Sequence, residues 1–425
     1  MKTIVNPEAG KLGCLLPITE WNQIKAIKIE GPLNIDDFFF LKGCSNIEYL
    51  DISETNSPEI FEPTCASHNN ILKHIIIPNN TKEILDYAFS FFSSIESISI
   101  PAGTSRIYGN AFCYCTHLKE INVNSQNPFY VTIDGILYDK AIRTLIVCPE
   151  GKEGNIEIPD SVQTIADRAF FGCANISAIK LPDDLKSIGA GAFLQCRNME
   201  TLNIPEGVTI LDGCVFFGCK KLKNIQIPNK VILLGNQAFY DCNKLNNIQI
   251  PASVTVIDHA FCGSNNLEYI SIDDKNKTFS DIDGIIYDKD KKSLIQYPCG
   301  REGVFTTPRD VKEISSHAFE GAKRITSFVA SDWLERIGDY GFHDCAGLNS
   351  VYLPTTMRSI GAHAFDSCAY INAFYCNTFS PPVCDETSFL YVNQKEARLY
   401  VPEHSVEAYS CAKGWMNFKH IEALK

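Results

Sequence analysis

The chain of 425 residues has no apolar stretch that approaches the length of a membrane span and no run of basic residues. A helix that crosses a bilayer needs about 20 mostly apolar residues, so no membrane-spanning helix is expected. The formal net charge of -12 and the lack of a basic run argue against nucleic acid or an anionic membrane surface as a partner. Protein and glycan partners remain.

Common signatures of catalysis are absent as well. There is no Gly-rich phosphate loop, no H-E-x-x-H and no G-x-S-x-G. Among the nine histidines, His317 and His363 occupy matching positions two repeats apart, and His343 lies at a different offset. Two repeats correspond to about 10 Å in a stacked sheet, which is too far for one metal ion. The sequence therefore predicts no enzyme, no cofactor and no metal site.

What the sequence does contain is a recurring phrase, P-x-x-V-x-x-I-G-x-x-A-F-x-x-C-x-x-L-x-x-I-x-I. Adjacent copies begin about 23 residues apart, and repetition at a fixed period of this length is typical of a solenoid. We expect about a dozen coils, and ten copies of the phrase begin at Pro78, Pro101, Pro159, Pro182, Pro205, Pro228, Pro251, Pro308, Ser331 (in place of the proline) and Pro354.

Each phrase predicts one coil with a strand and a buried ring. The L-x-x-I-x-I segment alternates like a half-buried strand, and the proline after it ends that strand. The phenylalanine of the A-F pair is predicted to point inward from the opposite wall, where rings of successive coils stack about 4.8 Å apart. This column comprises Phe89, Phe112, Phe170, Phe193, Phe216, Phe239, Phe261, Phe319, Phe342 and Phe365.

Seven of the 18 cysteines follow the same period, and no C-x-x-C pair is present. Stacked residues lie within the Cα distance of a disulfide, but parallel side chains have poor S–S geometry. We expect buried free thiols that act as small hydrophobes, in preference to disulfides or zinc sites. The repeated cysteines are Cys115, Cys173, Cys196, Cys219, Cys242, Cys345 and Cys368, and Cys44 has a similar local setting.

The repeated phrase resembles the BspA-type leucine-rich repeat family, most densely over residues 72–376. The flanks are also similar to that family, with N-P-E-A-G-K-L-G-C-L-L-P at residues 6–17 and L-Y-V-P at residues 399–402. The resemblance implies a right-handed leucine-rich-repeat solenoid with a parallel sheet on one face. It also implies export and surface display in gut bacteria, and a role in adhesion.

The expected organisation is an N-terminal cap over residues 1–71, a solenoid over 72–376 and a C-terminal cap over 377–425. The first cap is predicted to hold a helix over Gly10 to Glu20, two strands one period apart at Ile27–Ile29 and Leu50–Ile52, and an irregular loop over residues 53–71. In the second, a strand through Leu399 leads into a short helix from Ser405, and Trp415, Phe418 and Ile421 seal the last coil. A solenoid needs such caps because its end coils are apolar.

Two inserts of about 35 residues, near 124–158 and 273–307, interrupt the period. Asp134-Gly135 and Asp283-Gly284 lie between apolar runs and predict hairpin turns. The second insert carries several aspartates, which leaves two readings: a calcium site or, as we expect, a solvated acidic edge.

Each predicted strand has two outward positions, whose side chains recur with the period of the repeat. They are the two positions on either side of the first isoleucine in the I-x-I segment of the phrase. Polar and aromatic side chains there suit a recognition surface, although cross-strand stacking that only stabilises the sheet explains them as well. The candidate ligand-binding residues are Asn224, Gln226, Asn247, Gln249, Tyr269, Tyr352 and Tyr375.

The sequence thus favours a non-enzymatic, secreted or cell-surface binding protein, with a structural spacer that has no ligand of its own as the alternative. A host or bacterial surface protein, a matrix component or a polysaccharide is the expected partner of a monomer. Met1–Pro17 lacks the pattern of a secretory signal. We expect a mature form from which a signal was removed, and an intracellular product is the alternative.

Overall fold

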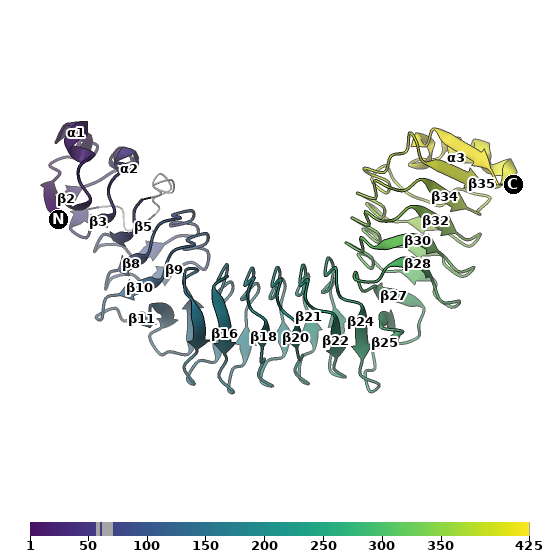
Figure 1. Ribbon diagram of the computed structural model, residues 1–425, viewed down its shortest axis with the longest axis horizontal. Helices are drawn as coiled ribbons and strands as arrows, with labels where there is room; N and C mark the ends of the chain where they lie inside the picture. The colour runs from purple at the N-terminus through teal and green to yellow at the C-terminus, as the bar shows by residue number, and fades with distance from the viewer. Residues whose placement is uncertain (57–59, 62–70, 425) are drawn as a thin grey trace. The chain divides into compact units, whose positions relative to one another are not determined.

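A computed structural model describes residues 1–56, 60–61 and 71–424 of the chain (Figure 1). It contains two compact units, Met1–Val208 and a second that begins at Thr209. Each unit is a β-solenoid, in which every coil of about 23 residues adds a rung to parallel sheets. Most of the irregular loop predicted over residues 53–71 lies outside the described residues.

The predicted L-x-x-I-x-I strands are confirmed, and they form a wall that we call the strand face. Their apolar residues alternate inward, as in β8, where Ile98 and Ile100 are buried. In the first unit the strands of this face are β2 (Ala26–Pro32), β3 (Tyr49–Asp51), β6 (His74–Ile76), β8 (Ser97–Ile100), β10 (Glu120–Val123), β14 (Gly154–Glu157), β16 (Ile176–Lys180) and β18 (Thr201–Leu202). In the second they are β20 (Asn224–Ile225), β22 (Asn247–Ile250), β24 (Tyr269–Ile272), β28 (Gly303–Thr306), β30 (Ile325–Val329), β32 (Ser350–Leu353), β34 (Ala373–Cys376), β35 (Arg398–Val401) and β36 (His420–Ala423).

A second, two-residue strand per coil was not predicted. It lies at the V-x-x-I segment and forms an opposite wall, which we call the back wall. These strands are β5 (Ile60–Phe61), β7 (Glu83–Ile84), β9 (Arg106–Ile107), β15 (Thr164–Ile165) and β17 (Ser187–Ile188) in the first unit, and β19 (Ile210–Leu211), β21 (Leu233–Leu234), β23 (Val256–Ile257), β29 (Glu313–Ile314), β31 (Arg336–Ile337) and β33 (Ser359–Ile360) in the second.

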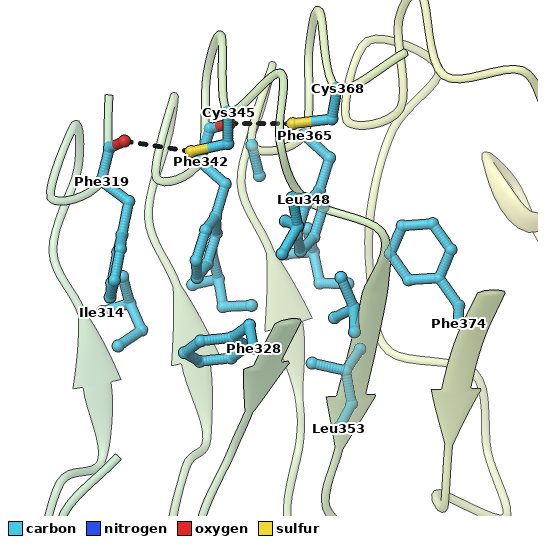
Figure 2. Close-up of a cluster of buried hydrophobic side chains, with 14 of the residues drawn as sticks. Ile314, Phe319, Phe328, Phe342, Cys345, Leu348, Leu353, Phe365, Cys368 and Phe374 are labelled. Carbon is cyan, nitrogen blue, oxygen red and sulfur yellow. Dashed lines mark hydrogen bonds between the residues drawn. The ribbon is translucent and has the colours of Figure 1, made fainter. Parts of the chain in front are cut away.

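The predicted phenylalanine column fills the space between the two walls. All ten rings are buried. Within a unit the rings of neighbouring coils stack, for example Phe319 on Phe342 at 4.5 Å and Phe342 on Phe365 at 5.1 Å between centroids (Figure 2). Each ring is therefore buried by the coils above and below it, which one coil alone could not do.

The predicted cysteine ladder consists of buried free thiols. Their role as small hydrophobes is only part of the account, because the thiols also donate hydrogen bonds along the stack. Cys345 Sγ lies 3.1 Å from the Phe319 carbonyl oxygen, and Cys368 Sγ lies 3.0 Å from that of Phe342 (Figure 2). In the coil that begins at Pro251, Ser264 replaces the cysteine and donates to the Phe239 carbonyl at 2.5 Å. In these coils the position thus holds a small donor that bonds to the phenylalanine carbonyl of the preceding coil.

Each insert combines a hairpin with one coil that departs from the repeated phrase, which we call the divergent coil. The predicted turns are confirmed: Asp134-Gly135 joins β11 (Tyr130–Ile133) to β12 (Ile136–Asp139), and Asp283-Gly284 joins β25 (Phe279–Ile282) to β26 (Ile285–Asp288). All four turn residues have positive φ, as a type I′ turn requires.

The remainder of each insert returns to the solenoid. β13 (Thr144–Val147) and β27 (Ser293–Gln296) join the back wall beside β15 and β29, while β14 and β28 join the strand face. In the second insert Tyr297 takes the place of the column phenylalanine and stacks on Phe319 at 4.5 Å.

The aspartates of the second insert cap turns. Asp288 Oδ1 accepts hydrogen bonds from the backbone N–H groups of Lys292 and Ser293, and Asp281 Oδ1 accepts one from Ile272. Asp139 of the first insert accepts the equivalent pair of bonds, so this role belongs to the module. Among the described residues no group of His, Cys, Asp or Glu side chains could hold a metal ion, and the calcium reading has no support.

The predicted helix over Gly10 to Glu20 is wrong. That segment forms a short 3-10 turn, η1 (Leu12–Cys14), and a separate α1 (Ile18–Trp21) that begins after Pro17, because proline disrupts a helix interior. Two elements of this region were missed. They are β1 (Lys2–Val5), which pairs with β2, and α2 (Ile35–Gly43), which has a capping box at Asn34. The offset of one period between the first strands is confirmed, since Ile27 pairs with Leu50. A further short strand, β4 (Thr55–Asn56), also pairs with β2.

The C-terminal segment has the predicted strand and short helix, but its last strand, β36, was not predicted. β35 leads through η2 (Glu403–Ser405) into α3 (Val406–Cys411) and η3 (Trp415–Asn417). Trp415 and Phe418 are buried against the last coils, while Ile421 lies on β36, which adds a final strand beside Leu399.

We expect Phe216→Ala to cost about 3 to 5 kcal/mol of unfolding free energy, as other large core truncations do. Phe216 is fully buried and stacks on Phe239 at 5.3 Å. Urea unfolding measures the effect, and Ile232→Ala, at a side chain that is 49% exposed, serves as the control with a change within about 0.5 kcal/mol. A loss below about 1 kcal/mol at Phe216 would contradict burial of the column.

Thiol labelling should separate the ladder from the surface cysteines. Among the described cysteines only Cys14 and Cys411 are exposed, so these should react first in the native protein. Burial raises the pKa of Cys196 and Cys242 in the ladder, as it raises that of Cys44 to about 11, and so lowers their thiolate fraction. In denaturant, intact-mass analysis should find all 18 cysteines labelled. A shortfall of two or more would indicate disulfides.

Candidate functional site

The strand face of the second unit carries all seven predicted ligand-binding residues. On β22 and β24, Asn247 pairs with Tyr269 and Gln249 pairs with Ser271, so the outward side chains continue in two columns. Asn224, Gln226, Asn247 and Gln249 are exposed. None of these four amide side chains has an intramolecular hydrogen-bond partner in the described part of the chain, so each can donate and accept a bond to a ligand.

A shallow hollow of about 490 Å³ lies where the strands of three successive coils begin. Its lining is entirely polar and consists of Lys223, Asn224, Lys244, Asn246, Asn247, Asn266 and Glu268. Asn224 and Asn247 were predicted as site residues, whereas the other five were not. These five residues come just before the strand of each coil, where the repeated phrase does not indicate whether a side chain points inward or outward.

Tyr269 stands at the end of this amide region, against the hairpin of the second insert. A Cβ atom on Gly284 would lie 2.4 Å from the Tyr269 ring, so the φ of +73° and the close packing both require glycine there. The ring remains 45% exposed. The hairpin therefore covers part of the ring and fixes its position on the face.

A second feature of the face is a stack of three tyrosines near the C-terminal end of the unit. Tyr352 and Tyr375 are parallel, with centroids 4.4 Å apart, and Tyr375 stacks on Tyr400 at 4.8 Å. Strand pairing places the three residues in one column of β32, β34 and β35. Tyr400 was missed because it belongs to the C-terminal cap, outside the repeated phrase. Burial and the neighbouring phenols raise the pKa of Tyr375.

Small side chains flank this stack in the adjacent column. Ser327, Ser350 and Ala373 are successive partners there, and the hydroxyls of the two serines are 2.9 Å apart. Tyr352 and Tyr375 therefore stand beside the small side chains of Ser350 and Ala373, whereas Arg398 takes the equivalent place beside Tyr400.

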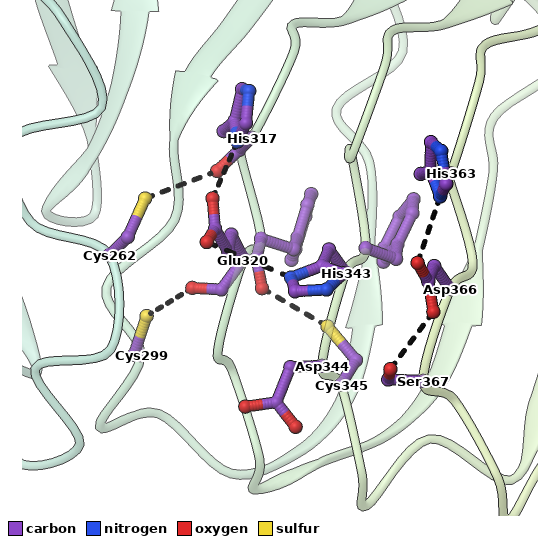
Figure 3. Close-up of polar contacts among 12 residues, drawn as sticks. Cys262, Cys299, His317, Glu320, His343, Asp344, Cys345, His363, Asp366 and Ser367 are labelled. Carbon is purple, nitrogen blue, oxygen red and sulfur yellow. Dashed lines mark hydrogen bonds and ion pairs between the residues drawn. The ribbon is translucent and has the colours of Figure 1, made fainter. Parts of the chain in front are cut away.

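The predicted histidine positions form part of a polar cluster on the turns of the second unit (Figure 3). Tyr340 lies between His317 and His363, with centroids 4.8 Å from each ring, so the two histidines are separated as predicted. The close neighbour of His317 is His259, at 4.0 Å. The divergent coil lacks this turn, and the turns of the coils on either side of it meet directly. The sequence did not indicate this contact.

Glu320 joins two of these histidines. His317 Nδ1 lies 2.5 Å from one carboxylate oxygen of Glu320, and His343 Nδ1 lies 3.7 Å from the other (Figure 3). Burial opposes ionisation of Glu320, but the two imidazoles outweigh it and lower its pKa to about 2. Glu320 in turn raises the pKa of His343. The cluster is an ion-pair network without a nucleophile or an open cleft, and no metal-binding group occurs in the described residues.

The first unit holds one buried carboxyl group of note. Glu150, on the divergent coil, accepts a backbone hydrogen bond from Tyr114 and is 7% exposed. Burial raises the pKa of Glu150 to about 7, although backbone N–H groups partly offset this effect. It lies beside the aromatic core, in a small hollow that Cys113, Cys148 and Arg168 also line.

The fold and the strand face define the class of protein. Parallel strands, coils of about 23 residues and a core of stacked apolar side chains are those of a leucine-rich-repeat solenoid. The chain belongs to the family described as the BspA type leucine rich repeat region, whose model matches residues 22–147, 150–268 and 299–401. No curated protein matches this chain.

Solved structures of bacterial leucine-rich repeat proteins are similar to it. A leucine rich cell surface protein from Faecalibacterium prausnitzii A2-165 is 24% identical, with 83% of this chain and 88% of that chain covered and a TM-score of 0.54. A leucine-rich repeat protein from Bacteroides ovatus ATCC 8483 is 21% identical, with coverage of 84% and 85% and a TM-score of 0.43. The first likeness supports the fold. Separately, none of the helices in the described residues has the length and apolar character needed to span a membrane.

The buried carboxyl group predicts a pH dependence of stability that Glu150→Gln removes. Because the folded-state pKa of about 7 exceeds the ordinary value of 4.5, stability that is fully present below pH 4.5 should decrease as the pH rises through 7. The amide keeps an acceptor for the Tyr114 N–H but has no proton to lose. At pH 8 the variant should be more stable than the parent by on the order of 1 to 3 kcal/mol.

Urea unfolding at pH 5 and pH 8 measures this difference. Asp310→Asn, at an exposed turn carboxylate, is the control and should leave the pH dependence intact. Equal pH dependence in the parent and in Glu150→Gln would contradict the raised pKa.

Proposed function

We propose that this protein is a non-enzymatic, secreted or cell-surface binding protein whose strand face in the second unit recognises a partner outside the chain. The partner class is a host or bacterial surface protein, a matrix component or a polysaccharide, and the solenoid acts as a monomer. The observation that carries the proposal is the stacked column of Tyr352, which is exposed, and Tyr375 and Tyr400, which are half-buried.

Tyrosine suits recognition because it offers a rigid apolar ring and a hydroxyl group with few rotatable bonds. In this column the sheet already holds the rings in position, so binding would restrict the motion of few side chains. Ser327, Ser350 and Ala373 leave room for a ligand beside the rings. Extracellular placement is part of the proposal and is supported by the family and by the cell-surface description of the Faecalibacterium prausnitzii protein.

The alternative is a structural spacer, and one observation favours it. Tyr352 and Tyr375 are parallel within 1°, so much of each ring face is used within the stack. Cross-strand pairs of this kind stabilise a sheet by roughly 0.2 to 1 kcal/mol, which is a sufficient reason for them without any ligand.

An array of extracellular-matrix proteins and of host and bacterial glycans distinguishes the two. We expect at least one specific binder, and we expect Tyr352→Ala/Tyr375→Ala to weaken that binding by about tenfold or more, as loss of interface hot spots does. The matched control is Tyr370→Ala/Tyr391→Ala, which removes two tyrosines that are 68% and 72% exposed and lie outside the strands of the face.

Circular dichroism must confirm that both variants fold. Loss of binding in the first variant alone supports recognition by the tyrosine column. No binder for the parent protein, or equal binding by all three proteins, would favour the spacer.

A further inference from the structure

We propose that the polar hollow around Asn224 and Asn247 is a binding site for an acidic glycan, one whose sugars carry carboxylate groups. This inference rests on the proposed function in taking the strand face as a binding surface, and it names the ligand of a part of that face distinct from the tyrosine column. The hollow measures about 490 Å³, within the range of small-ligand sites.

The lining excludes most other ligand classes. It contains amide and charged side chains only, with no apolar or aromatic anchor. A bound protein segment would ordinarily place an apolar or aromatic side chain in a pocket, and this hollow offers none. Sugar hydroxyls both donate and accept hydrogen bonds, as the amides of Asn224 and Asn247 do, so they can satisfy a lining that consists of amides.

Two successive coils repeat this donor–acceptor pattern. Asn224 and Asn247 occupy the same outward position of β20 and β22, and Tyr269 takes that position in the next coil. Asn266 also lines the hollow, but its Nδ2 donates to the Asn243 carbonyl at 2.5 Å. Rungs of a sheet are about 4.8 Å apart, so Asn224 and Asn247 stand at a spacing that neighbouring hydroxyls of an extended sugar chain can follow. Neither Asn224 nor Asn247 has a side-chain partner within the described residues.

The positive charge around the hollow favours an acidic sugar over a neutral one. The chain as a whole has a net charge of -12, yet residues 213–250 contain five lysines and a single acidic residue, Asp241. Asp241 pairs with Lys220 at 3.2 Å, which is away from the hollow. Lys244 lines the hollow and has no ion pair in the described part of the chain.

The lining thus holds two lysines, Lys223 and Lys244, and one carboxylate, that of Glu268, and Lys244 is the cation that a ligand can pair with. An anionic group would complement this excess of positive charge, and Glu268 can accept hydrogen bonds from neighbouring hydroxyls. Since the lysines are solvent-exposed, the attraction should decrease with ionic strength.

The test is a set of short oligosaccharides that contain galacturonic, glucuronic or sialic acid, together with neutral oligosaccharides of equal length and a glutamate-rich peptide. Binding to the full chain is measured by calorimetry at 50 and 300 mM salt. We expect at least one acidic oligosaccharide to bind at least tenfold more tightly than its neutral counterpart, and more weakly at the higher salt concentration.

Two variants locate the site. Asn224→Ala/Asn247→Ala and, separately, Lys244→Gln should each weaken binding by about fivefold or more, with an unchanged melting temperature. Lys230→Gln removes a nearby exposed lysine that does not line the hollow and should bind like the parent. Lys244→Gln keeps the test valid if the double variant folds poorly.

The inference is overturned if no acidic oligosaccharide binds in preference to the neutral one, if the peptide binds as tightly, or if the hollow variants bind like the parent. Tyr352→Ala/Tyr375→Ala should retain glycan binding. If no acidic oligosaccharide binds at the hollow, but the tyrosine variant loses another binder, only this inference is wrong. If the hollow binds an acidic oligosaccharide, but no binder depends on the tyrosines, only the role of the tyrosine column in the proposed function is wrong.

Discussion

The burial of each phenylalanine ring between the rings of neighbouring coils is the interaction on which the rest of the structure depends. A single coil has no interior of its own, so its ring is removed from water only when the next coil stacks in the same register. The Phe342 ring lies in this register, with its centroid 4.5 Å from that of Phe319 and 5.1 Å from that of Phe365. The thiol-to-carbonyl hydrogen bonds follow the same direction and add a second donor to carbonyls that already accept a backbone N–H within their own turn.

Departures from the period show what this constraint permits. Each insert supplies one strand to each wall and replaces the turn between them, so a new sheet begins on both walls at the insert while the turns of the flanking coils approach each other. His259 and His317 are in contact for this reason, although they are far apart in the chain. The ion pairs of Glu320 with His317 and His343 form beside this contact.

The outward positions of the strand face are free of the packing constraint, and there the sheet can carry function. Stacked tyrosines and repeated amides both contribute to sheet stability, so their presence alone does not distinguish recognition from support. Accessibility does bear on the question. Tyr352 and Tyr375 stand beside small side chains, and the exposed amide side chains of Asn224 and Asn247 have no partner within the described part of the chain. The stacked rings can meet a ligand at low entropic cost, and the amides can exchange bound water for its hydrogen bonds.

The sequence by itself determined the coil, its period, the buried phenylalanine and cysteine columns, the hairpin turns and the strand that faces outward. All of these follow from residue type at a fixed spacing, because the same local environment recurs in every coil. Only the tertiary structure decided the back-wall strand, the break of the N-terminal helix at Pro17 and the addition of Tyr400 to the tyrosine column. It also decided the contact between His259 and His317 and the hollow around Asn224 and Asn247. These features depend on which coils become neighbours and on the direction of side chains outside the repeated phrase, and nearest-neighbour packing settles both only once the coils are stacked.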